Sequence, residues 1–431
     1  MQTRYCCAVI LALCAAWSQA QSTSLPDIYF ITVDTLRADH LGCYGYSRPT
    51  SPNIDALAKR SLLFEDFVCE VPLTAPSFSS MMTSRYPRVN GNVRNGLPLP
   101  KSIPLLAELL QQSGYQTACV QSNWTLKAEL SGLNRGFDIY DDGFHTKRWG
   151  LLVSERNGTE VAERAIDLIT KRDATKPLFL WVHFSDPHAP YKKRRGFDPW
   201  KERIEPGDRV AQTRARYDSE IAFTDDRIAD VLQHTRKENA YIVFLADHGE
   251  SLYEHGYVGH GRRIYQDNLR VPLLIAGPGI DPTRSTAPAR GIDIAPTVLG
   301  LAGLPPSPEM LGVNLRVAPP ALDRVRVVET YGGAVPNLPG AKSIMLNQPP
   351  IHIGIIHQDW KLILSGEKTE LYNLATDPGE LRDLSEIEVE TRNRLRALSA
   401  EWETQHPRLE DSKADLTNDD LEALKSLGYV D

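Results

Sequence analysis

The chain has 431 residues, which is enough for a large hydrophobic core and for two structural units. Its composition, with 42% apolar and 24% charged residues, is that of an ordinary globular protein. The net charge of -7 provides no basic footprint, so we expect no nucleic-acid partner.

The first 20 residues have the pattern of a secretory signal peptide. Arg4 supplies a positive charge, residues 6–17 are apolar, and Ser18 and Ala20 provide small residues for cleavage after Ala20. The apolar stretch is too short to remain as a membrane-spanning helix, and no later stretch is long and apolar enough. We therefore expect an exported protein, periplasmic or secreted, without a transmembrane span after cleavage.

Strands and helices alternate up to about Gly303. Short apolar runs predict buried strands at 27–33, 115–121, 178–184, 241–245 and 271–276. Helical spacing predicts helices at 52–64, 104–112, 157–171, 211–236 and 293–301, and Thr74 with Pro76 marks a further helix start. This alternation predicts an α/β fold with a mainly parallel central sheet that is flanked by helices on both faces.

Beyond Gly303 the pattern changes to a proline-rich linker followed by shorter runs. Strand-like runs at 326–328, 352–356, 360–364 and 370–374 predict a small antiparallel sheet, followed by helices from about Ser385 and Asn418. We therefore expect a signal peptide at 1–20, a catalytic domain at 26–310, a C-terminal subdomain at 320–395 and a helical tail at 396–431.

Four of the predicted strands end in polar residues, at the edge where open α/β sheets bind their ligands. These residues are Asp34, Asn123, Asp186 with His188, and Asp247 with His248. The two carboxylates and one imidazole of Asp34, Asp247 and His248 suit a divalent cation. Zn²⁺ or Mn²⁺ is favoured, and Ca²⁺ stays open. A glycine-rich loop then brings His255 and His260 into the same region.

Thr74 is the candidate nucleophile because it stands at a predicted helix N-terminus. Backbone N–H groups and the helix dipole stabilise an alkoxide or a bound phosphoryl or sulfuryl group there. Metal coordination would lower the pKa of the hydroxyl further. Taken alone, however, the segment fits a plain N-cap threonine better, a role that contributes about 1 kcal/mol.

Seven segments of the chain, in order, resemble the sulfatase branch of the alkaline phosphatase superfamily. They are ITVDTLRADHLGCYGY (31–46), PNIDALA (52–58), LTAPSFSSMMTSRYP (73–87), HFSDPHAPY (183–191), DHGESLYEHGYVGHG (247–261), RVPLLIAGPG (270–279) and TELYNLATDPGELRDL (369–384). The resemblance implies an alkaline phosphatase-like fold and a covalent intermediate on a metal-bound nucleophile. It assigns the metal to Asp34, Thr74, Asp247 and His248.

The departures from the sulfatase pattern concern the reacting group. Sulfatases carry a Cys or Ser that is oxidised to formylglycine, with Pro two residues later and Arg four residues later. This chain has Thr74, Pro76 and Phe78, and threonine cannot become that aldehyde, so we expect no formylglycine. One of the family's paired aspartates is Thr35, and the Lys and His of its Gly-Lys-Trp-His segment fall on Asn123 and Thr125.

The remaining pattern resembles phosphoethanolamine transferases and nucleotide phosphodiesterases, which use an unmodified Thr on Zn²⁺ or Mn²⁺. That resemblance implies that His188 and His260 hold non-bridging oxygens or protonate the leaving group, and that Asn123 donates to an equatorial oxygen. A second metal held by Asp186, His188 and His260 is the alternative. Asp39, His40 and His183 either support the site residues or are merely structural; we favour the structural interpretation and leave the role of His255 open.

Three functions follow from this pattern. The first is hydrolysis or transfer of a phosphate mono- or diester through a phospho-threonine at Thr74. The second is cleavage of a sulfuric ester, as in arylsulfatases, with Thr74 acting directly. The third is a non-catalytic binding role, against which the retained Asp34, Asp247, His248 and His188 argue. We expect a small-molecule, glycan or lipid ester as substrate, while the sequence is silent on the oligomeric state.

Overall fold

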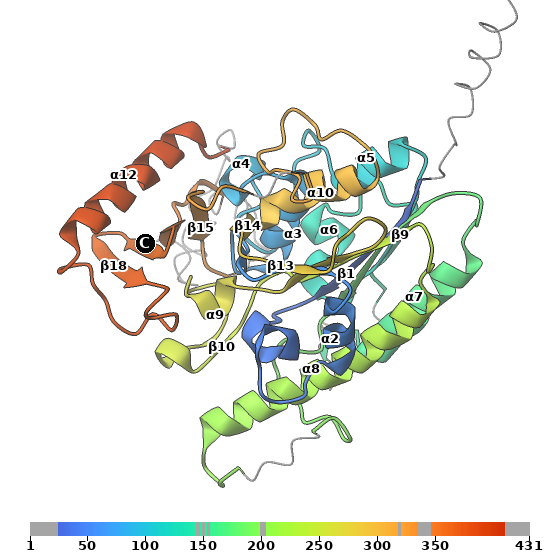
Figure 1. Ribbon diagram of the computed structural model, residues 1–431, viewed down its shortest axis with the longest axis horizontal. Coiled ribbons are helices and arrows are strands. Elements are labelled where there is room, and N and C mark those ends of the chain that lie inside the picture. Colours follow the sequence, from blue (N-terminus) through green and yellow to red (C-terminus); the bar gives the residue numbers. More distant parts are fainter. Residues whose placement is uncertain are drawn as a thin grey trace, which may run out of the picture.

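The computed structural model describes residues 25–143, 147–148, 151–152, 156–198, 204–317, 320–333 and 346–409. Its main element is an eight-stranded sheet (Figure 1). In spatial order the strands are β13 (Thr283–Ser285), β2 (Leu62–Phe64), β12 (Leu273–Ala276), β9 (Ala240–Ala246), β1 (Asp27–Val33), β8 (Leu178–Phe184), β4 (Gln116–Val120) and β5 (Ile139–Asp141). The expected signal peptide at 1–20 and the helix expected from Asn418 lie outside the described residues.

The prediction of a mainly parallel sheet is confirmed. Strands β9, β1, β8, β4 and β5 pair in parallel, and every residue of β1, β8 and β9 is buried, as a sheet covered on both faces requires. The exception is β12, which runs antiparallel to both β9 and β2. The chain between β9 and β12 contains only one short helix, α9 (Gln266–Leu269), and therefore lacks the crossover that a parallel strand needs.

Helices cover both faces of the sheet (Figure 1). On one face lie α3 (Thr74–Thr83), α5 (Leu106–Gln112) and α10 (Ile294–Leu301); on the other lie α2 (Pro52–Ala58), α7 (Gly158–Lys171) and α8 (Arg209–His234). The predicted helix at 52–64 is wrong beyond Ala58. Residues 62–64 form β2 instead, because they pair with β12 and β13 and this sheet pairing outweighs helical spacing.

The expected C-terminal antiparallel sheet is also confirmed. It consists of β15 (Arg326–Thr330), β16 (His352–His357), β17 (Trp360–Ser365) and β18 (Lys368–Asn373), in that spatial order. Helix α12 (Val389–Gln405) covers it and packs Leu395 and Trp402 into the core of this subdomain. The carboxylate of Glu380 accepts the backbone N–H of Gln266 at 2.6 Å, so this subdomain contacts α9 directly.

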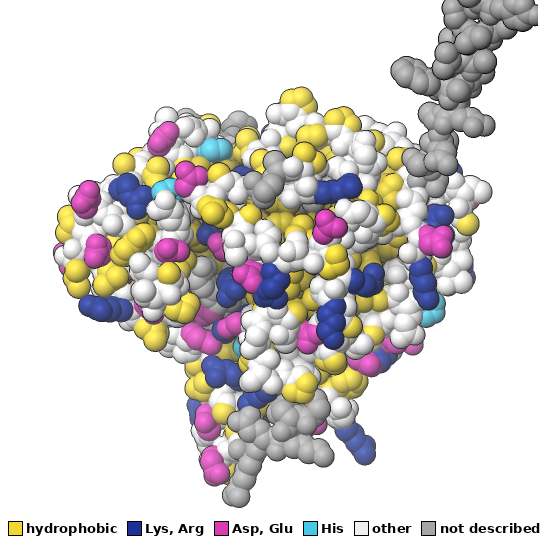
Figure 2. Space-filling model, in the orientation of Figure 1, with side chains coloured by type: hydrophobic (Ala, Val, Ile, Leu, Met, Phe, Trp, Pro, Cys, Tyr) yellow, Lys and Arg dark blue, Asp and Glu magenta, His cyan; other side chains and the backbone are white. Residues whose placement is uncertain are grey.

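The surface of the described part of the chain shows neither a membrane span nor a basic field. No helix there is both long and apolar enough to cross a bilayer. On the face that Figure 2 shows, Lys and Arg side chains are intermixed with Asp and Glu.

Candidate metal and nucleophile site

The candidate site lies where the neighbouring strands β1 and β9 end. Asp34 directly follows β1, and Asp247 and His248 directly follow β9. The register pairs Val33 with Ala246, so these side chains leave the sheet from adjacent positions. All three are completely buried. The sheet therefore brings two acidic groups and one imidazole together in a region without water contact.

One ligand atom from each of Asp34, Asp247 and His248 lies within 4.8 Å of the other two. Asp247 Oδ1 accepts the N–H groups of Thr35 at 3.2 Å and of His248 at 2.9 Å, whereas its Oδ2 has no hydrogen-bond partner among the described residues. His248 Nδ1 lies 3.0 Å from the carbonyl oxygen of Gly249. A carbonyl can only accept, so Nδ1 carries the proton and the lone pair lies on Nε2.

Asp34, like Asp247, has one carboxylate oxygen with a hydrogen-bond partner and one without, in the part of the chain that the structure describes. Its Oδ2 accepts a short hydrogen bond from Asn123 Nδ2, and its Oδ1 has no hydrogen-bond partner within the described ranges. Oδ1 lies 3.7 Å from His248 Nε2, which in turn lies 3.3 Å from Asp247 Oδ2. Asp34 and Asp247 thus each have one oxygen fixed by the protein and one without a hydrogen-bond partner among the described residues, and His248 presents the lone pair of Nε2 to the same cluster. This arrangement fits a divalent metal ion.

Thr74 is the first residue of α3, as its sequence context predicted. Its Oγ1 lies 3.3 Å from His248 Nε2, so the hydroxyl borders the same cluster. The side chain of Ser77, one turn later, donates to the carbonyl oxygen of Asp247 at 2.7 Å and ties α3 to the end of β9. The hydroxyl of Thr74 is therefore held at a helix N-terminus and beside the candidate metal ligands.

Burial and neighbouring charges set the protonation states of the cluster. Burial raises the pKa of Asp34, but the adjacent His183 and His248 outweigh it and hold this pKa well below its usual range. Burial raises the pKa of Asp247 well above its usual value, and the negative charge of Asp34 adds to this effect. Burial, followed by the charge of His260, lowers the pKa of His248 to about 3. His248 is therefore neutral at physiological pH, as a metal-ligating imidazole must be.

Asn123 stands beside Asp34 and is held rigidly. It caps a short 3₁₀ helix, Trp124–Leu126, and its Oδ1 accepts the N–H of Thr125 at 2.8 Å and the hydroxyl of Thr125 at 2.9 Å. Because Oδ1 is occupied, the amide nitrogen is directed at Asp34 Oδ2. Asn123 thus contributes a donor to the site.

His188 and His260 lie next to the cluster. The ring of His260 is 4.5 Å from the ring of His248 and 5.1 Å from that of His188, measured between centroids. His260 Nδ1 lies 3.1 Å from Oε1 of the buried Glu250. The structure therefore brings both predicted imidazoles to the site.

Asp186 is engaged elsewhere. Its Oδ1 accepts the N–H of Gly158 at 3.1 Å and an Arg194 N–H at 2.8 Å. Within the described residues, Asp186, His188 and His260 do not form a group of converging ligand atoms like that of the candidate metal site. The backbone of Gly158 and the ion pair with Arg194 thus both use Oδ1 of this carboxylate.

Three further residues from the segments that carry the resemblance lie in structural contacts. Asp39 pairs with Arg37 at 2.7 Å, and His40 Nδ1 lies 2.6 Å from a carboxylate oxygen of Asp218. His255 stacks on a tyrosine ring with 3.7 Å between centroids. These contacts agree with a structural interpretation of Asp39 and His40, and they give His255 a packing role.

Sequence reasoning missed two residues that border the site, and the structure places a third close to a candidate metal ligand. Asn95 accepts the N–H of Ala75 at 3.0 Å, and Glu250 bonds His260. His183, interpreted above as structural, has its Nε2 only 3.8 Å from Asp34 Oδ2. Glu250 follows His248 closely and could have been suspected from that position, whereas nothing near Asn95 in the sequence marks it.

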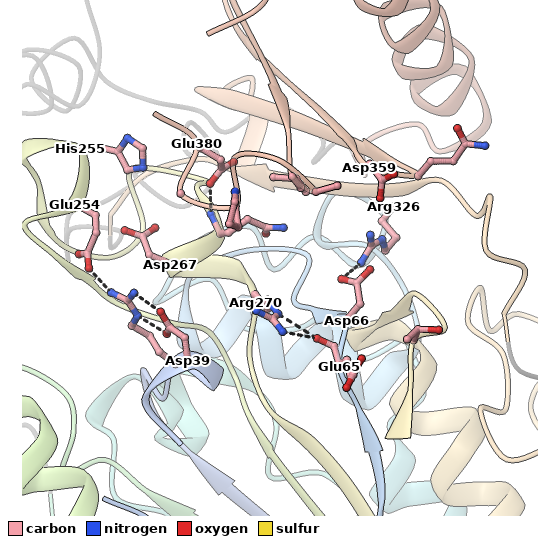
Figure 3. A pocket seen from close by; sticks show the side chains of 18 residues that line it. Asp39, Glu65, Asp66, Glu254, His255, Asp267, Arg270, Arg326, Asp359 and Glu380 are labelled. Atoms are coloured by element: carbon pink, nitrogen blue, oxygen red, sulfur yellow. Dashed lines mark hydrogen bonds and ion pairs between the residues drawn. The ribbon is translucent and has the colours of Figure 1, made fainter. Parts of the chain in front are cut away.

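A cavity lined by charged side chains lies away from these residues. It has a volume of about 790 Å³ and opens between the main sheet and the C-terminal subdomain (Figure 3). Several of its lining charges are paired with one another: Arg37 contacts both Asp39 and Glu254, and Arg326 contacts Asp66. None of the candidate metal ligands lines it.

Comparison with known proteins places this site in a family. The family model described as Sulfatase matches residues 26–304. The choline-sulfatase of Rhizobium meliloti (strain 1021) is 26% identical, with 85% of this chain and 83% of that protein aligned. The N-acetylglucosamine-6-O-sulfatase of Bacteroides thetaiotaomicron is 24% identical, with 88% of this chain and 85% of that protein aligned.

Solved structures show the same fold. The phosphonate monoester hydrolase of Agrobacterium radiobacter superposes with a TM-score of 0.72 at 19% identity, covering 92% of this chain and 99% of that chain. The family model spans most of the chain, and its match includes the six segments of the resemblance that lie between residues 31 and 279. The chain therefore belongs to the sulfatase family of the alkaline phosphatase superfamily and is a hydrolase of ester bonds from a metal-dependent family.

Proposed function

We propose that this protein cleaves phosphate mono- or diesters through a covalent phospho-threonine on Thr74. The observation that carries the proposal is the unmodified threonine hydroxyl at the start of α3, 3.3 Å from His248 Nε2. Threonine cannot be oxidised to the aldehyde that sulfatases use, so the hydroxyl itself must attack. The fold shared with a phosphonate monoester hydrolase supports chemistry at phosphorus.

Asp34, Asp247 and His248, with Thr74, would hold the divalent metal. A mixed carboxylate and imidazole set favours Zn²⁺ or Mn²⁺, with Ca²⁺ as the alternative. The bound metal would supply charge neutralisation at the transferring group and would lower the pKa of the attacking hydroxyl.

The side chains of the site have different roles in the proposed reaction. Thr74 Oγ1 attacks phosphorus, a new P–O bond forms, and the bond to the leaving alcohol oxygen breaks. His188 and His260, which adjoin His248, bind the non-bridging oxygens or protonate the leaving oxygen. Asn123 Nδ2 donates to an equatorial oxygen. Water then releases phosphate from Thr74, whereas an acceptor alcohol in its place would make the enzyme a phosphotransferase.

A sulfuric ester hydrolase is the second candidate. Two relatives that cover most of the chain carry sulfatase names, for choline sulfate and for an N-acetylglucosamine 6-O-sulfate. Sulfate esters bear less negative charge than phosphate esters, so a site without Lys or Arg among its proposed residues could serve them. A non-catalytic binding role is the third, and it predicts that loss of the Thr74 hydroxyl changes no measurable property.

We further propose that the protein is exported through its N-terminal signal peptide and acts outside the cytoplasm on a small-molecule, glycan or lipid ester. Residues 1–20 carry the pattern on which this rests. Detection of mature protein beginning after Ala20 in the periplasm or medium tests this proposal, and uncleaved protein in the cytoplasm would contradict it.

The reaction is tested by comparing the hydrolysis of an aryl phosphate, a bis-aryl phosphate and an aryl sulfate. Each substrate is offered to the purified enzyme with Zn²⁺, Mn²⁺ or Ca²⁺, and kcat/KM is measured. We expect one of the phosphate esters to be preferred, and phosphate to be found on the Thr74 peptide after acid quenching. A clear preference for the sulfate would instead establish the second candidate.

A further inference from the structure

His183 is a completely buried imidazole on β8 that the proposed reaction does not use. The register places it opposite Thr32 on β1, two residues before Asp34. Its Nδ1 lies 2.9 Å from Thr32 Oγ1, and its Nε2 lies 3.8 Å from Asp34 Oδ2. One ring nitrogen therefore contacts β1 and the other faces the candidate metal ligand.

The hydrogen bonds around Thr32 favour one orientation of the protons. Trp181 Nε1 donates to Thr32 Oγ1 at 3.0 Å, and an indole N–H can only donate. Thr32 therefore keeps its own hydroxyl proton for another acceptor, either His183 Nδ1 at 2.9 Å or the carbonyl oxygen of Val182 at 3.3 Å. The shorter contact is the one with His183. This assigns the ring proton of His183 to Nε2, the nitrogen that faces Asp34.

The buried surroundings of the His183 ring provide no hydrogen-bond partner for Nε2 among the described residues. Phe78, on α3, packs edge-on against His183 with 5.0 Å between ring centroids, and Phe78 is itself fully buried. Burying an N–H without a hydrogen-bond partner costs stability, and the acceptor that the Nε2–H group faces is Asp34 Oδ2, 3.8 Å away.

We propose that His183 is a positioning residue that holds Asp34 so that Oδ1 remains free for the metal. Asp34 Oδ2 is contacted by Asn123 from one side and faces His183 from the other, and Oδ1 has no hydrogen-bond partner in the described ranges. His183 itself is outside the group of converging ligand atoms, so it acts through Asp34 rather than on the metal. This inference rests on the metal site of the proposed function, but not on the identity of the ester.

The test measures metal binding directly, by calorimetric titration of metal-free protein with Zn²⁺, Mn²⁺ and Ca²⁺. His183→Phe keeps the ring shape and removes both nitrogens, and we expect the dissociation constant to rise 10- to 100-fold, as is typical when a partner of a metal ligand is lost. His183→Gln, which keeps an N–H at the end of the side chain, should recover much of this loss. An unchanged dissociation constant in a folded His183→Phe protein would overturn the proposal.

Two further variants keep the test decisive. Thr32→Val is nearly isosteric and removes only the hydroxyl that orients His183, so it should weaken metal binding by a smaller factor. If His183→Phe does not fold, an unchanged affinity in Thr32→Val overturns the proposal instead. His40→Gln is the matched control, because His40 is buried but bonds Asp218, and it should leave the affinity unchanged.

The outcome separates this inference from the proposed function. Wild-type protein that binds metal but cleaves sulfate rather than phosphate esters would refute the proposed reaction and leave the role of His183 standing. Weakened metal binding in the variants, together with a rate that recovers at saturating metal, supports positioning. Wild-type protein that binds none of Zn²⁺, Mn²⁺ and Ca²⁺ in the same titration would overturn both.

Discussion

Carboxylates gather in two regions of this molecule, and the two groups differ in whether the protein itself provides their partners. In the cavity of Figure 3, Arg37 binds Asp39 at 2.7 Å and Glu254 at 2.9 Å, so cations of the protein itself neutralise the acids. At the ends of β1 and β9, Asp34 and Asp247 are completely buried, and each keeps one oxygen without a hydrogen-bond partner among the described residues. The buried region at the ends of β1 and β9 is therefore the one that suits an added cation.

This difference also explains why cavity size is a poor guide here. The cavity between the two sheets is large, but several of its charged groups already form ion pairs, and a charged ligand that used those groups would have to break the pairs. In the candidate site the protein supplies fixed donors to one oxygen of each carboxylate and leaves the other oxygen without a hydrogen-bond partner among the described residues. The uncommitted atoms, rather than the number of acids, mark the site.

The largest expected effect is that of the nucleophile. Thr74→Val keeps the β-branched shape at the start of α3 and removes the hydroxyl, so kcat on the preferred ester should fall by a factor on the order of 10³ or more. Metal content, measured by elemental analysis, should fall far less. Thr74→Ser is the control that keeps a hydroxyl and should retain measurable turnover. Unchanged activity in Thr74→Val would remove Thr74 from the mechanism and support a binding role.

The next effect concerns the metal. Asp247→Asn removes the charge from a ligand that is fully buried, so we expect the purified variant to lose its metal and most of its activity. Adding metal at about 100 times its dissociation constant should stabilise wild-type protein by about 2.7 kcal/mol, seen as a rise in Tm, and should leave the variant unchanged. An equal rise in Tm for both proteins would place the metal elsewhere.

Much of the site could be predicted because it is attached to the strongest local signals. Asp34, Asp247 and His248 follow two of the most apolar runs in the chain, and parallel strands bring their carboxyl ends to one edge. Thr74 is similarly marked by the Thr-Ala-Pro helix start. The direction of β12 and the strand at 62–64 were not predictable, because each depends on pairing with segments that are remote in the sequence.

Two further residues have contacts that the sequence does not show, because their partners are remote in the chain. His183 lies within an apolar run, and only its register against Thr32 reveals that it faces Asp34. Asp186 stands at a strand end like the metal ligands, yet Arg194 and Gly158 use its carboxylate. A strand-end carboxylate is recognised from sequence, whereas its partners are recognised only in the fold.

A third buried carboxylate sharpens the comparison. Glu70 is 2% exposed, its Oε1 accepts the N–H of Ile292 at 3.0 Å, and its Oε2 has no hydrogen-bond partner in the described part of the chain. It is not part of the converging ligand group, and burial raises its pKa from 4.5 to about 7. An unpaired oxygen without neighbouring ligands therefore favours protonation rather than metal binding.

The raised pKa of Glu70 makes the stability of the folded protein depend on pH. Because the folded protein binds the Glu70 proton more tightly than the unfolded chain, the contribution is fully present below about pH 4.5 and is lost as the pH rises through about 7. The loss is roughly 3 kcal/mol in the free energy of unfolding. Glu70→Gln should remove this dependence, so its stability relative to wild type should improve between pH 5 and pH 8 in urea denaturation. Parallel stability curves for the two proteins would contradict the assignment.

The smallest effect is expected from a substitution in the cavity, where the carboxylate of Asp39 already has a cationic partner. The side chain of Asp39 is 54% exposed, and Arg37 retains Glu254 as a partner when Asp39 becomes Asn. An ion pair of this exposure contributes about 0–1 kcal/mol, so the free energy of unfolding of Asp39→Asn should change by less than about 1 kcal/mol. Metal content and kcat/KM should match those of wild type, whereas the same substitution at nearby Asp34 should abolish both. The two aspartates are near neighbours in the sequence and carry the same charge, so a loss of metal in Asp39→Asn would show that paired cavity acids also serve the site. Retention of metal would show that an uncommitted oxygen is what separates a ligand from a structural carboxylate.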